Sequence, residues 1–188
     1  MDRLDLQRIS TALRRIGWIT FWAQLVLAVV VMGVLFFNAV GSRLTANPER
    51  ALGLGPGLSL TTLSFFVLLF ALWQDWGVVR CGRALAGEGA RPSRGETSAL
   101  IKRGILASLL GLVLGAIGYQ ALAGSLFVQA SSQAPGFFAA PSGAGGLVSF
   151  PITSIEMLSV LSNTQAVMGH LIGLIASLWL LQRIHRRA

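Results

Sequence analysis

The chain contains four long apolar stretches, separated by shorter segments that are rich in glycine, proline or charged residues. Each stretch has at least the roughly 20 residues that a helix needs to cross the hydrocarbon core of a bilayer. Because that core holds no water, the backbone must pair its N–H and C=O groups within the segment, which favours a helix. The pattern predicts an all-α integral membrane protein with one four-helix domain over residues 1–188. The expected spans are residues 16–40, 58–79, 105–128 and 152–181.

Three shorter segments complete the predicted architecture. Between residues 4 and 16, leucine and isoleucine recur at helical spacing among arginines, which is typical of a short amphipathic helix on a membrane surface. A simple extension of the first span explains the same spacing, so both interpretations stay open. Residues 53–57 read Gly-Leu-Gly-Pro-Gly and predict a turn. Residues 129–150 are rich in Gly, Ala, Pro and Ser and predict a flexible loop.

The distribution of charge predicts the orientation. The N-terminal segment, the second connection and the C-terminal tail hold 13 of the 15 Lys and Arg residues. Basic residues close to membrane spans stay on the cytoplasmic face, so both termini are expected there. The net charge of +8 does not indicate nucleic acid, because the charges flank the spans and no aromatic-basic RNA motif accompanies them. Attraction to anionic membrane lipids accounts for it.

Polar residues within the spans are the candidate functional residues, because a polar side chain in hydrocarbon is costly. They include Gln24 in the first span and Glu156, Asn163 and His170 in the fourth. The last three are seven residues apart, so they share one helix face with a drift of about 20° per step. Such a stripe predicts a path for a cation or a proton. The alternative is that these side chains bond neighbouring helices, at about 0.6 kcal/mol each on average.

Two of these residues are also candidate ligands. Glu156 and His170 have the carboxylate and imidazole groups that bind iron and other transition metals. His170 is also a candidate ligand for chlorophyll, with a direct hydrogen bond as the alternative. No resident cofactor is otherwise indicated. Asp75, near the end of the second span, is expected to pair with Arg80 or Arg83.

Small residues predict where the helices approach each other. Gly111 and Gly115 in the third span, and Gly169 and Gly173 in the fourth, recur at four-residue spacing. Membrane helices associate through close packing at such positions, so we expect the third and fourth spans to be in contact. A dimer interface on either row of glycines is the alternative. The expected partners are membrane lipids and either further copies of the chain or a larger membrane complex.

Motifs of soluble enzymes do not occur in the sequence. It has no phosphate-binding loop, no Gly-x-Ser-x-Gly, no Cys-x-x-Cys and no His-Glu-x-x-His. Only 12% of the residues are charged, and a separate soluble domain has no room in 188 residues. We therefore expect a protein that is not an enzyme.

Three segments resemble a known membrane family. Residues 17–25 (GWITFWAQL), residues 118–126 (GYQALAGSL) and the fourth span from Glu156 to Leu181 are similar, in order and spacing, to a cyanobacterial and plastid family. Its plant members are chloroplast inner-envelope proteins, described both as an iron permease ("permease in chloroplasts") and as a Tic translocon component. The cyanobacterial members have no assigned function.

The resemblance implies both a location and a range of functions. It implies a cyanobacterial-type plasma or thylakoid membrane. It also implies transport of iron or another metal cation, or protein translocation. The alternative is an accessory subunit that assembles photosynthetic or other membrane complexes.

Overall fold

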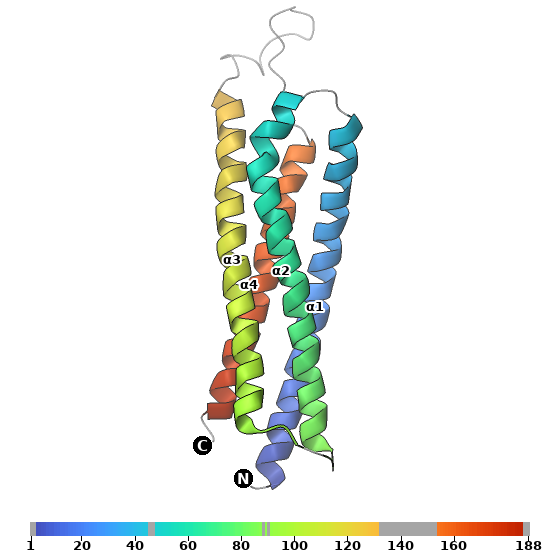
Figure 1. Cartoon of the computed structure of the whole chain (residues 1–188), viewed down its shortest axis with the longest axis vertical. Helices are drawn as coiled ribbons and strands as arrows, with labels where there is room; N and C mark the ends of the chain where they lie inside the picture. Colours follow the sequence, from blue (N-terminus) through green and yellow to red (C-terminus); the bar gives the residue numbers. More distant parts are fainter. Residues whose placement is uncertain (1–2, 45–47, 88, 90, 132–153, 186–188) are drawn as a thin grey trace, which may run out of the picture.

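The four helices form an antiparallel bundle in which each helix runs opposite to the one before it (Figure 1). A computed structural model describes residues 3–44, 48–87, 89, 91–131 and 154–185. The helices are α1 (Arg3–Leu44), α2 (Pro48–Ala86), α3 (Arg94–Ser131) and α4 (Ser154–His185). α1 begins, α2 ends, α3 begins and α4 ends at the same end of the bundle. We call it the basic end because arginines of all four helices lie there, among them Arg8, Arg83, Arg94 and Arg183.

The prediction of four membrane helices is confirmed, because every helix is long and apolar enough to cross a bilayer. The helices are longer than the predicted spans. α1 has 42 residues, and at 1.5 Å per residue it measures roughly 63 Å, about twice the thickness of the hydrocarbon core. The helix ends therefore extend beyond the hydrocarbon.

Residues 3–16 continue α1 without a break, so the structure has the extended first helix and no separate surface helix. The predicted flexible segment 129–150 begins inside α3, which ends at Ser131. The remaining residues of that segment lie outside the described part of the chain.

The predicted turn at residues 53–57 is wrong, because α2 begins at Pro48 and includes them. Proline suits the first position of a helix, where its missing N–H is not needed. Pro56 lies inside the helix, and the Ser59 hydroxyl donates a hydrogen bond of 2.9 Å to the Pro56 carbonyl oxygen. Glycine and proline are tolerated in membrane helices because nearby side chains and neighbouring helices satisfy the backbone groups they free. The glycine-proline composition therefore did not mark a loop here.

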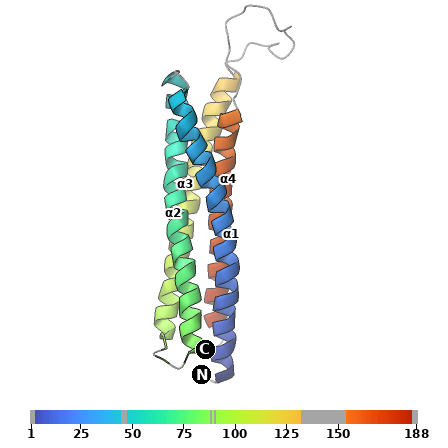
Figure 2. The same cartoon turned by 90° about the vertical axis from the view of Figure 1, so that its right-hand side faces the viewer.

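The helices are arranged in a ring in chain order, and α1 returns to contact α4. Figure 2 shows the same arrangement from the side, with α1 lying across α4. α2 also touches α4 across the ring, whereas α1 and α3 do not meet within the described residues. α2 and α4 therefore form the centre of the bundle.

The interior combines polar and apolar side chains, whereas the surface of the spans is largely apolar. Large apolar side chains on all four helices are exposed, such as Phe36, Phe66, Leu106 and Ile175. The fully buried side chains include Gln24, Ser64, Asn163 and His170. Lipid solvates apolar groups but offers no partner to polar ones, so the polar groups must pair inside the bundle.

An aromatic cluster joins α1 to α2 towards the basic end. The Trp18 ring lies 5.6 Å from both the Phe21 and the Trp76 ring centroids. The Arg83 guanidinium lies 5.9 Å from the Trp18 ring and 5.8 Å from the Trp76 ring. An aromatic group bearing a cation is suited to the membrane interface, where Trp is enriched.

α1 and α2 approach each other closely at Gly82. The Ser10 hydroxyl donates a hydrogen bond of 2.7 Å to the Gly82 carbonyl oxygen. A Cβ at Gly82 would lie 3.0 Å from the Leu13 Cβ and 3.1 Å from the Arg14 backbone nitrogen. Only glycine allows the two backbones to lie this close.

We predict that Gly82→Val will destabilise the bundle, because the added side chain must push α1 away from α2 and break the Ser10 hydrogen bond. Overpacking of this kind costs about 1–3 kcal/mol. Thermal unfolding in detergent, followed by circular dichroism, should show a lower midpoint. Gly124→Val is the matched control, since no atom of another helix lies within 4 Å of its Cβ position among the described residues. An unchanged midpoint for Gly82→Val would contradict the close approach.

Candidate functional site

Buried polar side chains follow the interior of the bundle from the basic end to the opposite end, and we call this set the polar axis. Each of them is at most 8% exposed. α4 supplies more of them than any other helix. The members are Asp75, Ser108, Gln24, His170, Ser64, Asn163, Thr61, Ser159, Asn38 and Glu156.

Gln24 joins α1 to α4. Its Nε2 donates a hydrogen bond of 3.1 Å to the Gly169 carbonyl oxygen. A carbonyl oxygen only accepts, so the amide nitrogen must face Gly169 and the amide oxygen must face elsewhere. That oxygen, Oε1, is buried and has no hydrogen-bond partner among the described residues. A Cβ at Gly173 would collide with Nε2, so the glycine makes room for the amide.

His170 lies where α4, α2 and α3 meet. Its Nε2 is 3.1 Å from the Ser64 carbonyl oxygen. Because that oxygen only accepts, Nε2 carries the proton, and in the neutral ring Nδ1 keeps a free lone pair. Nδ1 is buried and has no hydrogen-bond partner among the described residues. The ring rests on the backbone of Gly111, where a Cβ would collide with it, and the Ser64 hydroxyl donates a 3.0 Å hydrogen bond to the Gly111 carbonyl oxygen.

Asn163 has both ends of its side-chain amide bonded. Nδ2 donates to the Gly115 carbonyl oxygen at 2.9 Å, and the Thr61 hydroxyl lies 2.9 Å from Oδ1. The residue therefore ties α4 to α3 and α2. For Asn163, this is the alternative that was stated from the sequence: the side chain bonds neighbouring helices.

The far end of the polar axis holds Glu156 and Asn38. Glu156 lies in the first turn of α4 and is 2% exposed, in a position where the helix dipole favours a negative charge. The Asn38 Oδ1 accepts a hydrogen bond of 3.3 Å from the Ser159 hydroxyl. Its Nδ2 has no hydrogen-bond partner among the described residues.

The four residues predicted from the sequence, Gln24, Glu156, Asn163 and His170, do not form one site. Gln24 of α1 lies beside the turn of α4 that carries His170, because it bonds to the adjacent residue Gly169. Glu156 is 14 residues from His170 on the same helix, roughly 21 Å along its axis, so the two cannot share an ion. Within the described residues, no group of three or more His, Cys, Asp or Glu side chains is placed to hold a metal ion.

The four candidate packing glycines all lie at helix contacts, but they face different neighbours. On α3, Gly111 faces His170, and a Cβ at Gly115 would lie 2.6 Å from the Val167 Cγ2. These two contacts join α3 to α4. On α4, a Cβ at Gly169 would lie 3.0 Å from Leu68 of α2, and Gly173 faces Gln24 of α1. The two glycine rows therefore do not pack against each other.

Asp75 does not pair with Arg80 or Arg83, contrary to expectation. Asp75 faces the interior, whereas both arginines are exposed, and the Arg83 guanidinium lies over Trp18 and Trp76. Oδ2 of Asp75 is buried and has no hydrogen-bond partner among the described residues. The helical turn between these positions directs the acid and the arginines to different faces of α2.

A chlorophyll does not fit at His170. The side chain is fully buried, its Nε2 lies against the Ser64 carbonyl oxygen, and its ring rests on Gly111. A macrocycle would have to separate the helices to reach Nδ1.

The sequence analysis missed the small polar partners on the other helices, namely Thr61, Ser64, Ser108 and Asn38. On α2 a signal was present. Gly57, Thr61, Ser64 and Leu68 are spaced by four, three and four residues, and all are buried. Small hydroxyl residues at helical spacing within a span mark a face that packs against other helices.

We predict that Gly111→Ala will destabilise the bundle by about 2 kcal/mol because the new methyl group collides with the His170 ring. His170→Ala in the same chain should recover part of that loss. Unfolding of both single variants and the double variant gives the interaction energy. We expect it to exceed about 1 kcal/mol, and strictly additive effects would show that the ring does not rest on Gly111.

Comparisons with known proteins identify the family of the chain. Residues 3–185 match the family described as "Protein of unknown function (DUF3611)". "Protein TIC 21, chloroplastic" of Arabidopsis thaliana is 26% identical over 184 residues, which cover 95% of this chain and 58% of the plant protein. The chain thus spans less than two thirds of that relative. No solved structure matches the chain. The resemblance seen in the sequence is confirmed, and the chain belongs to the DUF3611 family of membrane proteins.

Proposed function

We propose that this protein is a transport component of a photosynthetic membrane system, that it is not an enzyme, and that a divalent metal cation such as iron(II) moves along the polar axis. One observation carries the proposal. Three buried atoms without a hydrogen-bond partner among the described residues are acceptors, namely Asp75 Oδ2, Gln24 Oε1 and His170 Nδ1. Carboxylate, amide and imidazole groups are ligands for divalent metals.

These acceptors follow one another along the bundle. Val78 and Val79 of α2 contact Gly17 of α1, so Asp75 lies about one turn beyond that level, away from the basic end. Gln24 lies two turns beyond Gly17 on α1. His170 follows in the turn that Gln24 bonds. A cation that enters from the basic end therefore meets successive acceptors.

In this proposal, the described arrangement corresponds to the closed state of the path. His170 rests on Gly111, Leu68 on Gly169 and Val167 on Gly115. A cation would therefore pass only when α4 moves away from its neighbours α2 and α3. Because the helices are closely packed at these contacts, the axis suits an ion better than a polypeptide, and protein translocation would need several copies of the bundle.

The comparisons support a transport role in a photosynthetic membrane. The relative is a chloroplastic protein of a plant, and the family resemblance in the sequence includes both an iron permease and a translocon component. Because the chain covers 58% of that relative, the activity of the longer protein enters only as part of this proposal.

The alternative is an accessory subunit that binds other membrane proteins. One feature favours it, a largely apolar groove of about 450 Å³ between α2 and α3. Its lining residues are Phe66, Val67, Phe70, Arg103, Leu106, Ala107 and Leu110. Such a groove could take a helix of a partner. Recovery of the chain with a stoichiometric membrane partner after gentle solubilisation, together with no cation uptake by the purified chain, would favour this function over transport.

We predict that Asp75→Asn will lower iron(II) uptake into proteoliposomes at least about tenfold, because the amide loses the negative charge that attracts the cation. The free energy of unfolding should stay the same or rise, since burying an amide costs less than burying a carboxylate. Glu96→Gln is the control, because it removes an exposed carboxylate at the basic end. Wild-type uptake by Asp75→Asn would exclude Asp75 from the path.

A disulfide between α3 and α4 should block transport reversibly. A Cβ at Gly115 would lie 3.9 Å from the Val167 Cβ, a separation that suits a disulfide. We predict that Gly115→Cys with Val167→Cys, in a Cys81→Ser background, will stop uptake when oxidised and restore it after reduction. The matched control is Val167→Cys alone, which should be insensitive to oxidant. Undiminished uptake by the cross-linked protein would show that α3 and α4 need not separate.

A further inference from the structure

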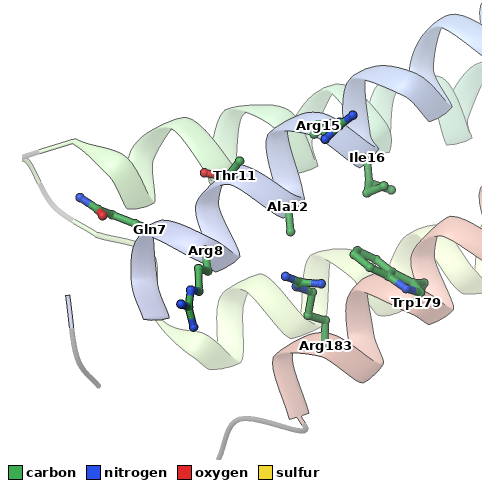
Figure 3. A pocket seen from close by; sticks show the side chains of 8 residues that line it. All are labelled: Gln7, Arg8, Thr11, Ala12, Arg15, Ile16, Trp179 and Arg183. Atoms are coloured by element: carbon green, nitrogen blue, oxygen red, sulfur yellow. The ribbon is translucent and has the colours of Figure 1, made fainter. Parts of the chain in front are cut away.

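A second candidate site lies outside the polar axis, in a groove between α1 and α4 at the basic end. Its volume is about 570 Å³. Figure 3 shows the side chains that line it. They are Gln7, Arg8, Thr11, Ala12, Arg15, Ile16, Trp179 and Arg183.

The groove is strongly basic. Three of its eight lining residues are arginines and none is acidic. Arg8 and Arg183 extend into the space between the two helices (Figure 3). The Arg183 guanidinium lies 5.0 Å from the Trp179 ring centroid, which restrains its position. Its Nε has no hydrogen-bond partner among the described residues.

Two apolar lining residues, Ile16 and Trp179, lie farther from the basic end than Arg8 and Arg183 (Figure 3). Ala12, Ile16 and Trp179 follow the groove towards the middle of the bundle (Figure 3). Ile16 lies one turn beyond Ala12, about 6 Å along α1, and the hydrocarbon is expected to begin at residue 16. The headgroup layer on each side of a bilayer is about 5–8 Å thick. Arg183 lies two residues, about 3 Å, beyond the expected end of the fourth span at residue 181, and therefore at headgroup depth. Arg8 lies about 12 Å from Ile16, on the water side of that layer. Ile16 and Trp179 lie where acyl chains begin.

We propose that this groove binds one anionic membrane lipid, whose phosphate or sulfonate group lies between Arg8 and Arg183 and whose acyl chain lies along Ile16 and Trp179. Guanidinium groups bind such anions through paired, charge-assisted hydrogen bonds. Basic pockets between membrane helices bind anionic headgroups in this way. The apolar wall distinguishes this site from diffuse attraction between basic residues and a charged surface, because such attraction involves no contact with an acyl chain. The proposal does not depend on a transport function.

The test uses the full chain, purified in detergent, freed of lipid and incubated with phosphatidylglycerol. Native mass spectrometry should show one retained phosphatidylglycerol per chain and much less phosphatidylcholine. Arg8→Gln with Arg183→Gln should lower the bound fraction at least about tenfold. Arg80→Gln with Lys102→Gln removes the same charge from exposed positions elsewhere at the basic end and should leave binding unchanged. Equal losses in the two double variants would overturn the proposal.

Ala12→Phe provides a test that leaves the charge unchanged. The ring should fill the groove and lower lipid binding, even if the arginine variant fails to fold. Retention of phosphatidylglycerol by a folded Ala12→Phe protein, judged by circular dichroism, would contradict a site in this groove. Inorganic phosphate at the same concentration as the lipid should not displace it. Displacement would show that the groove recognises a free anion, and the assignment to a lipid would be wrong.

Discussion

The absence of water from the bilayer core is the constraint on which the rest of this structure depends. A buried polar group can then be satisfied only by another part of the protein. Gln24, Asn163 and His170 bond to backbone carbonyl oxygens of neighbouring helices at 2.9–3.1 Å. Such short bonds require the helix axes to lie close together. Glycine at positions 111 and 173 leaves room for the imidazole and the amide, so polar and small residues stabilise the bundle together.

The same constraint distinguishes residues whose polar groups are all bonded to other helices from residues that are candidates for a function. Asn163 uses both ends of its amide to join three helices. Gln24 and His170 each use one end and leave an acceptor buried without a partner among the described residues. An unsatisfied acceptor in a dry interior costs free energy. Stability alone therefore does not explain why the chain retains such acceptors together with a buried Asp75. The proposed cation path rests on this observation.

The two proposed sites use different parts of the same bundle. The polar axis lies between the helices, where lipid does not reach. The arginine groove lies on the outside, where α1 and α4 reach the headgroup layer, and it is open to the bilayer. α4 belongs to both, through His170 and through Trp179 and Arg183. A lipid held between α1 and α4 would therefore contact the helix whose movement opens the path.

Periodicity and hydropathy alone determined that four apolar helices cross the membrane, because spans of about 20 residues need only local information. The sequence also determined the candidate polar residues and the glycines, since their types are unusual in lipid. Only the tertiary structure decided that residues 53–57 are helical, that Asp75 has no arginine partner, and that the glycines of α4 face α1 and α2. Partners such as Ser64 and Thr61 also became visible only there. The rotation and register of packed helices arise from contacts between residues far apart in the chain, which a local pattern does not contain.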